Sequence, residues 1–222
     1  MNKSITDTFT RGSYFVTGID TDAGKSYATG WLARLIARNG ETVITQKLVQ
    51  TGNKDYSEDI DIHRRLMGTG LLKSDELHIT APEIFSYPCS PDLAARIDKR
   101  DIDFKRIDDC SDMLAGQFGH LIIEGAGGVM VPLQGEYLTI DFIRERKLPT
   151  VLVTNGRLGS INHTLLSLYA LQKEGIEVWA VVYNRYFDKD ETIGADTRNY
   201  IKTWLERHSP ATLYLEMPEL KL

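Results

Sequence analysis

The chain has 222 residues, 42% of them hydrophobic and 26% charged, and a formal net charge of −5 at pH 7, which suits one domain over residues 1–222. The acidic balance argues against a nucleic-acid-binding protein, because such proteins normally carry a basic stripe. No apolar run approaches the roughly 20 residues that span a bilayer, and the N-terminus lacks a hydrophobic secretory segment, so we expect a cytoplasmic protein that binds neither membrane nor nucleic acid.

Short apolar runs alternate with amphipathic stretches along the chain. The apolar runs predict β-strands at residues 14–17, 42–46, 121–124, 150–154, 177–183 and 212–215. The amphipathic stretches predict helices at residues 26–38, 59–66, 106–117, 161–173 and 191–208. Gly40 is placed to end the first helix in a left-handed conformation. This alternation is typical of an α/β fold with a mostly parallel sheet that is covered by helices on both faces.

A phosphate-binding loop is predicted between the first strand and the first helix. Residues 18–26 read G-I-D-T-D-A-G-K-S, with five residues between the glycines instead of the usual four. Glycines let several N–H groups and the helix N-terminus point at one anion, while Lys25 would bridge the β- and γ-phosphates and the Ser26 hydroxyl would ligate Mg²⁺. A Gly-Lys-Ser tripeptide that merely starts a helix is the plain alternative. The strand–loop–helix context favours a single-domain, P-loop NTPase-like three-layer fold.

Three further motifs follow the loop in a fixed order. Residues 47–52 read K-L-V-Q-T-G, residues 124–128 read E-G-A-G-G, and residues 158–163 read L-G-S-I-N-H. With the loop, these motifs resemble the dethiobiotin synthetase family, and the resemblance extends over about residues 18–218, nearly the whole chain. It implies an ATP-dependent ligase of biotin biosynthesis that works as a homodimer with its active site at the interface.

The implied reaction is the ATP-dependent carboxylation and ring closure of 7,8-diaminononanoate. The diamine takes up CO₂ as a carbamate, and the carbamate oxygen attacks the γ-phosphate to give a carbamic–phosphoric anhydride. The second amine then closes the ureido ring of dethiobiotin, with release of phosphate. Such chemistry depends on positioning and on stabilising charge at the transferring phosphoryl group.

The resemblance also implies the roles of individual residues. The nucleotide would be held by Asp22, Ala23, Gly24, Lys25, Ser26, Glu124, Gly127 and Asn184, of which Asn184 would read the adenine edge. The Mg²⁺ ligands would be Ser26, Asp59 and Glu124, although Glu58 and Asp61 stand close enough to Asp59 to leave that position open. The catalytic groups would be Thr21, Lys25 and Lys47. The substrate would contact Lys47 and Thr51, and its distant carboxylate would be bound across the dimer by Ser160, Ile161, Asn162 and Tyr200.

Each of these residues also has a plain structural interpretation. Glu124 could be a satisfied acid beside a glycine-rich turn, and Asp59 could be an acid that the helix dipole favours. Lys47 could be an exposed residue at a strand end. Asn162 could simply cap its helix, and Tyr200 could be an exposed aromatic residue. The hydroxyls of Thr21 and Thr51 could bond local backbone, and Asn184 could be an ordinary turn residue.

The sequence departs from the family pattern at a few positions. Ile19 stands for threonine and Leu48 for proline, while Ser26 keeps the hydroxyl of the usual threonine. Leu215 stands where the family has glycine near its base pocket, which leaves the nucleotide preference open. The alternative function is a P-loop nucleotide switch or partition-type ATPase. Those proteins often carry an additional lysine near the start of the loop, and residues 18–23 contain none.

Overall fold

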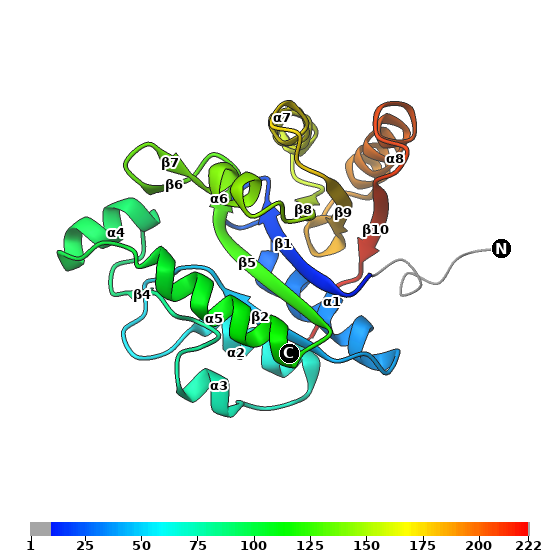
Figure 1. Cartoon of the computed structure of the whole chain (residues 1–222). Coiled ribbons are helices and arrows are strands. Elements are labelled where there is room, and N and C mark those ends of the chain that lie inside the picture. Colours follow the sequence, from blue (N-terminus) through cyan, green and yellow to red (C-terminus); the bar gives the residue numbers. More distant parts are fainter. Residues whose placement is uncertain (1–9, 222) are drawn as a thin grey trace.

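A six-stranded sheet forms the centre of the computed structural model, which describes residues 10–221 (Figure 1). The prediction that the N-terminus lacks a secretory segment concerns residues that lie almost wholly outside the described range. The strands of the sheet are β1 (Gly12–Gly18), β2 (Val43–Lys47), β5 (His120–Gly128), β8 (Thr150–Asn155), β9 (Val178–Asn184) and β10 (Leu213–Met217). These are the six predicted strands, with ends shifted by a few residues.

All neighbouring strands of this sheet are parallel, in the order β10-β9-β8-β1-β5-β2. β1 lies in the interior, with Phe15 paired to Ile123 of β5 on one side and to Thr150 of β8 on the other. Because the strands are parallel, their carboxyl ends meet at one edge, and the loops that follow β1, β2, β5, β8 and β9 gather there.

Helices cover both faces of the sheet, as predicted. Their bounds are α1 (Lys25–Arg38), α2 (Glu58–Met67), α5 (Phe104–Gln117), α6 (Thr139–Glu145), α7 (Ser160–Lys173) and α8 (Glu191–His208). Side chains of α5, α6, α7 and α8 pack with Phe15 in one buried cluster, whereas α1 packs with Tyr14 and Val16 in the other. Successive residues of β1 therefore point to opposite faces, which is why its sequence reads as a continuous apolar run.

The first helix shows how glycines set its ends. Gly24 precedes α1 with φ of 94°, and Gly40 follows it with φ of 83°, so the expected left-handed residue after the helix is confirmed. Between them, Gly30 lets α2 approach closely, because a Cβ there would lie 2.9 Å from the Leu66 side chain. This contact fixes α2, and with it Asp59, beside the phosphate loop.

Several short elements were not predicted. They are β3 (Gln50–Thr51), α3 (Lys73–Glu76), β4 (Ile84–Phe85), α4 (Pro91–Asp98), β6 (Pro132–Gln134), β7 (Tyr137–Leu138) and the 3₁₀ turn η2 (Arg185–Phe187). The helix α6 was also missed. Most of these elements are too short for hydrophobic periodicity to be legible. Among residues 10–221, no helix is both long enough and apolar enough to span a membrane.

Candidate active site

A cavity of about 790 Å³ opens at the carboxyl edge of the sheet. It is lined by residues of the loop after β1, the ends of β2 and β5, the start of α2, and η2 after β9. The predicted site residues that line it are Thr21, Asp22, Gly24, Lys25, Ser26, Lys47, Thr51, Asp59, Glu124, Gly127 and Asn184. Segments far apart in the sequence thus converge on one cavity.

The phosphate loop connects β1 to α1 and lies against the neighbouring strand. The Ile19 N–H donates to the Val153 carbonyl of β8 at 3.0 Å, which anchors the start of the loop. The Lys25 ammonium donates to the carbonyls of Asp20 at 3.1 Å and Thr21 at 2.8 Å, so it lies inside the curl of the loop. Burial, together with repulsion from Lys47, lowers the pKa of Lys25 to about 8. A bound phosphate would offer this ammonium far stronger acceptors than two carbonyls.

The lowered pKa of Lys25 predicts how nucleotide affinity varies with pH. Above about pH 8 the free protein loses this charge, whereas a bound triphosphate favours the charged form. Binding therefore takes up a proton, and ATP affinity measured in EDTA should fall by up to about tenfold per pH unit above that value. Calorimetry in buffers of different ionisation enthalpy would measure the proton uptake. Lys25→Arg, which stays charged, should remove the pH dependence.

Asn184, at the end of β9, connects the phosphate loop to the far side of the cavity. Its Nδ2 donates to the Ala23 carbonyl at 3.1 Å, and its Oδ1 accepts from the Tyr186 N–H at 3.1 Å. The turn interpretation of Asn184 is thereby confirmed, although the side chain also lines the cavity. Ala23 itself is fully buried, and its carbonyl is the acceptor of the bond from Asn184. Gly24 is required here, because a Cβ would lie 2.2 Å from the amide nitrogen of Asn184.

Gly24→Ala should therefore weaken nucleotide binding and stability together. The left-handed φ of 94° alone costs an alanine about 1–2 kcal/mol, and the clash with Asn184 pushes the loop out of shape. Gly40→Ala is the matched control, since it has a similar φ of 83° but nothing within 4 Å of the added carbon. We expect both variants to lose thermal stability and only Gly24→Ala to lose ATP affinity by calorimetry. Equal ATP affinity in the two variants would contradict the assigned role of Gly24.

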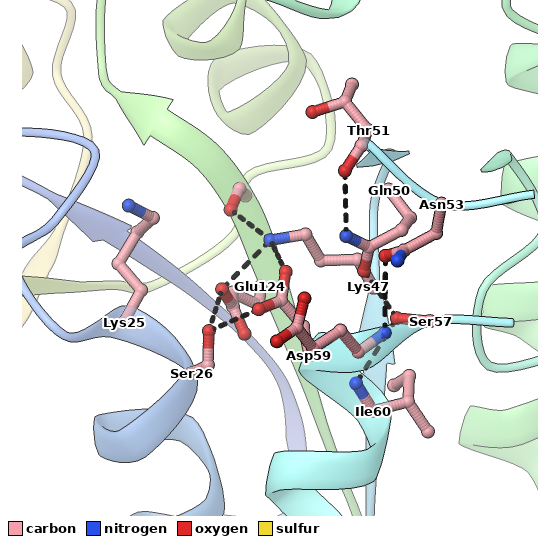
Figure 2. Close-up of polar contacts among 12 residues, drawn as sticks. Lys25, Ser26, Lys47, Gln50, Thr51, Asn53, Ser57, Asp59, Ile60 and Glu124 are labelled. Atoms are coloured by element: carbon pink, nitrogen blue, oxygen red, sulfur yellow. Dashed lines mark hydrogen bonds and ion pairs between the residues drawn. The ribbon is translucent and has the colours of Figure 1, made fainter. Parts of the chain in front are cut away.

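Beside the loop, two carboxylates, one hydroxyl and one ammonium form a compact cluster (Figure 2). Lys47 Nζ lies 2.6 Å from Asp59 Oδ2, 2.9 Å from Glu124 Oε1 and 3.1 Å from the Gly125 carbonyl. The Ser26 hydroxyl lies 2.6 Å from Asp59 Oδ1 and 3.0 Å from Glu124 Oε1. The strand-end lysine is thus buried, so the interpretation of Lys47 as an exposed residue is wrong.

The charges of this cluster stabilise one another. Burial opposes the charged form of Lys47, but Asp59 and Glu124 outweigh it and hold the pKa of the ammonium above its usual range. Burial likewise opposes the charged form of Glu124, but Lys47 and the hydrogen bond to His63 outweigh it and hold the pKa of the carboxyl well below its usual range. At neutral pH the lysine and the glutamate are both ionised.

The oxygens of Ser26, Asp59 and Glu124 converge as the predicted Mg²⁺ ligands would. Among residues 10–221, no group of three or more His, Cys, Asp or Glu side chains could hold a metal, so a purely protein-built cage is not part of the described chain. Mg²⁺ usually takes one or two carboxylates and completes its octahedron with phosphate oxygens and water. The two acids and one hydroxyl fit that chemistry. The Lys47 ammonium lies between the two acids, which shows that they can hold a positive charge at this position.

Helix α2 decides which acid faces the cavity. The side chain of Ser57 accepts from the Ile60 N–H at 3.2 Å and so fixes the start of the helix. Asp59 then points toward Ser26, whereas Asp61 pairs with Arg65 at 2.7 Å on the outside and Glu58 is exposed. Of the three neighbouring acids, Asp59 is the one that the structure places at the site.

The remaining predicted substrate residues lie outside this cavity. Ser160, Ile161 and Asn162 begin α7, and Tyr200 lies on α8 with 47% of its surface exposed. Gly159 precedes α7 as its N-cap, so the interpretation of Asn162 as the cap is wrong. Leu215 is buried in the core and does not line the cavity, so any effect on base recognition would be indirect.

His63 was missed by sequence reasoning. It is buried between β2 and β5, and its Nε2 lies 2.6 Å from Glu124 Oε2. Histidine spacing typical of a metal site is absent around it, but it follows Asp59 by four residues, which is one helical turn. That spacing is the signal that could have placed both side chains on one face of α2.

Comparison with known structures agrees with this fold. A plasmid partition protein of Borrelia burgdorferi bound to AMPPNP superposes with a TM-score of 0.54 at 12% identity, over 96% of this chain and 89% of that one. A ParA family ATPase of Chlorobium tepidum gives a TM-score of 0.53 at 16% identity, over 96% of this chain and 86% of that one. A family profile described as an AAA domain matches residues 12–221. The fold and the loop therefore define a P-loop nucleotide-binding protein.

Sequence relatives narrow this class to one family. The ATP-dependent dethiobiotin synthetase BioD 2 of Pasteurella multocida is 45% identical over 201 residues, which cover 90% of this chain and 94% of that relative. BioD 2 of Haemophilus ducreyi is 46% identical over 91% of this chain and 96% of the relative, and BioD of Chlorobaculum tepidum is 48% identical over 87% and 81%. The chain belongs to the dethiobiotin synthetase family of ATP-dependent ligases.

Proposed function

We propose that this chain forms dethiobiotin from 7,8-diaminononanoate, CO₂ and ATP by way of a carbamate and a carbamic–phosphoric anhydride. One amine adds to CO₂, and an oxygen of the carbamate forms a bond to the γ-phosphorus as the bond to ADP breaks. The second amine then attacks the carbonyl carbon, phosphate leaves, and the ureido ring closes. The observation that carries the proposal is the convergence of Lys25, Lys47, Asp59 and Glu124 on one cavity beside a phosphate loop.

The nucleotide would occupy the side of the cavity formed by the loop and η2. The N–H groups of residues 22–26 and the N-terminus of α1 suit the phosphates, and Lys25 supplies a cation for the β- and γ-phosphates. Gly127 has φ of 66° and lines the same cavity, so the backbone can approach the ligand there. Asn184 uses one amide hydrogen for the Ala23 carbonyl and one oxygen lone pair for the Tyr186 N–H. Its second amide hydrogen and second lone pair suit the adenine edge.

Ser26, Asp59 and Glu124 would hold Mg²⁺. The bound ion would neutralise charge on the phosphate oxygens during transfer. Lys47 has to leave at least part of its contact with the two acids when another cation enters. Its ammonium is then free to follow negative charge from the carbamate to the transferring phosphoryl group, a role that suits a compact cation on a flexible stem.

Threonine hydroxyls would complete the contacts around the reacting groups. Thr21 lines the cavity on the phosphate loop, where its hydroxyl can approach the transferring phosphoryl group. Thr51 lines it on β3, where its hydroxyl can bond a substrate nitrogen. In both positions a hydroxyl can donate to an oxygen or accept from an amine.

The distant carboxylate of the substrate would be bound across a homodimer. The N–H groups of Ile161 and Asn162 lie in the first turn of α7, where an anion is favoured, whereas the Ser160 N–H donates to the Arg157 carbonyl at 3.0 Å and would have to leave that bond to contact the substrate. Tyr200, an exposed residue of the neighbouring helix α8, could offer its hydroxyl to the same carboxylate. The homodimer, the cytoplasmic location and the extent of one domain over residues 1–222 stay predictions.

One assay tests the proposed reaction. Purified protein is given Mg-ATP, bicarbonate and 7,8-diaminononanoate, and ADP and the cyclic urea are measured. ADP formation that depends on the diamine and matches the urea supports the proposal. ATP hydrolysis at the same rate without the diamine, and with no urea, would favour the nucleotide-switch alternative.

A further inference from the structure

A chain of buried polar side chains runs from the protein interior to Glu124. His63 leaves α2 on the same face as Asp59, one helical turn further on, and points toward β5. Its ring is fully enclosed: Nε2 lies 2.6 Å from Glu124 Oε2, and Nδ1 lies 3.0 Å from Thr45 Oγ1 on β2. Both ring nitrogens are therefore used, and neither faces the cavity.

Thr45 is held in turn by an arginine. The buried Arg64 donates from Nη1 to Thr45 Oγ1 at 2.8 Å. Its Nε and Nη2 donate to the two oxygens of Asp75 at 2.9 Å and 2.8 Å, which fixes the plane of the guanidinium. A guanidinium has only donors, so the Thr45 oxygen must accept from Arg64 and is left with one proton to give.

The directions of these bonds follow from donor and acceptor counts. Glu124 is a carboxylate and can only accept, so His63 Nε2 must carry a proton. If Nδ1 accepts the Thr45 proton, every group in the chain is satisfied. If Nδ1 carried a proton as well, the hydroxyl proton of Thr45 would lose its acceptor in a fully buried place. The contacts thus assign one direction of donation, from Arg64 to Thr45, from Thr45 to His63 Nδ1, and from His63 Nε2 to Glu124.

This donation fixes how Glu124 presents its two oxygens. Oε2 is taken by His63, while Oε1 faces Lys47 at 2.9 Å and Ser26 at 3.0 Å. We propose that His63, oriented by Thr45 and Arg64, is a positioning residue that makes Glu124 a one-oxygen ligand for the divalent cation of the ATP site. The proposal rests on the metal-binding role given above to Glu124. It adds a buried His–Thr–Arg support that acts through Glu124 without touching nucleotide or substrate.

Metal binding can be measured without turnover. Mn²⁺ binding to the whole protein with AMPPNP is followed by electron paramagnetic resonance. His63→Leu removes the donor and should raise the Kd for Mn²⁺ by about 10–100-fold, as is usual when the outer partner of a metal ligand is lost. Thr45→Val removes only the hydroxyl that orients His63, so it should raise the Kd for Mn²⁺ by about tenfold, near the lower end of this range. His63→Gln, whose amide can still donate to Oε2, should recover much of the affinity.

Two controls separate positioning from general damage. His120→Leu removes a second buried histidine, which begins β5 at the end of the strand away from Glu124, and should leave the Kd for Mn²⁺ unchanged. Glu124→Gln in the same assay tests the metal site itself. If Glu124→Gln weakens Mn²⁺ binding and His63→Leu does not, the positioning role is wrong and the metal site stands. If neither variant weakens it, the metal assignment of Glu124 is wrong.

The wild-type protein offers a test that needs no variant. Nitrogen NMR of ¹⁵N-labelled histidine distinguishes a protonated from an unprotonated ring nitrogen. For His63 we expect a protonated Nε2 and an unprotonated Nδ1. A spectrum in which Nδ1 carries the proton would overturn the assigned direction of donation.

Discussion

Lys47→Met is expected to abolish most turnover while nucleotide binding survives. Lys25 and the backbone of the phosphate loop remain in place without Lys47, and Lys25 also loses a repulsive neighbour, so ATP affinity should not fall. The loss of a charge aimed at the reacting groups typically costs about 10²–10³ in kcat. The variant also leaves Glu124 buried without its ammonium partner, and the nucleotide-free protein should lose about 3–5 kcal/mol of unfolding free energy. Added Mg²⁺ should restore more stability to this variant than to the wild type.

Steady-state kinetics, ATP calorimetry and thermal melts with and without Mg²⁺ measure these effects. Lys105→Met is the matched control, because Lys105 is exposed on α5 and pairs with Asp109 of the next turn. It should leave all three measurements unchanged. A Lys47→Met protein that makes dethiobiotin at nearly the wild-type rate would remove Lys47 from the reaction.

Glu124→Gln should have the largest effect on the metal requirement. The change keeps the shape of the side chain but removes the charge that Lys47 and Ser26 contact and that the proposed Mg²⁺ would use. Loss of an outer partner of a metal ligand costs about 10–100-fold in metal affinity, and loss of the ligand charge itself should reach at least the upper end of that range. The Mg²⁺ concentration that gives half-maximal activity is the quantity to compare.

Glu83→Gln provides the matching variant for Glu124. Glu83 is also a buried glutamate with a cationic partner, Arg100, but it does not line the cavity. Glu83→Gln should reduce the stability of the protein without changing the Mg²⁺ concentration that gives half-maximal activity. If the two variants give the same titration curve as the wild type, Glu124 does not lie in the coordination sphere.

The sheet and its covering helices could be predicted from the sequence for a clear physical reason. A parallel strand that is buried on both faces reads as an unbroken apolar run, as β8 and β9 do. Gly40 could be placed because a helix end needs a left-handed residue there. The short helix α4 could not be predicted, because its eight residues are too few to reveal a periodic apolar face. It is held instead by tertiary packing of Ala94 and Ala95.

The site was predictable where a backbone motif defines it and less so where side chains meet across elements. The positions of Lys25 and Ser26 at the site could be predicted from the loop motif alone. The choice of Asp59 over Asp61 depends on the helix start at Ser57 and on how α1 and α2 pack, which sequence alone does not define. The direct bonding of Lys47 to Asp59 and Glu124 depends on the pairing of β2 with β5, whose residues are more than 70 positions apart.

The interior place of β1 has a consequence for synthesis on the ribosome. β1 spans Gly12–Gly18, yet its partners β5 and β8 begin only at His120 and Thr150. At about 5–20 residues per second, the nascent strand waits on the order of ten seconds for its second neighbour. The phosphate loop is therefore translated early but can reach its final place only after β8 is made, and the apolar β1 has at most β5 as a partner until then.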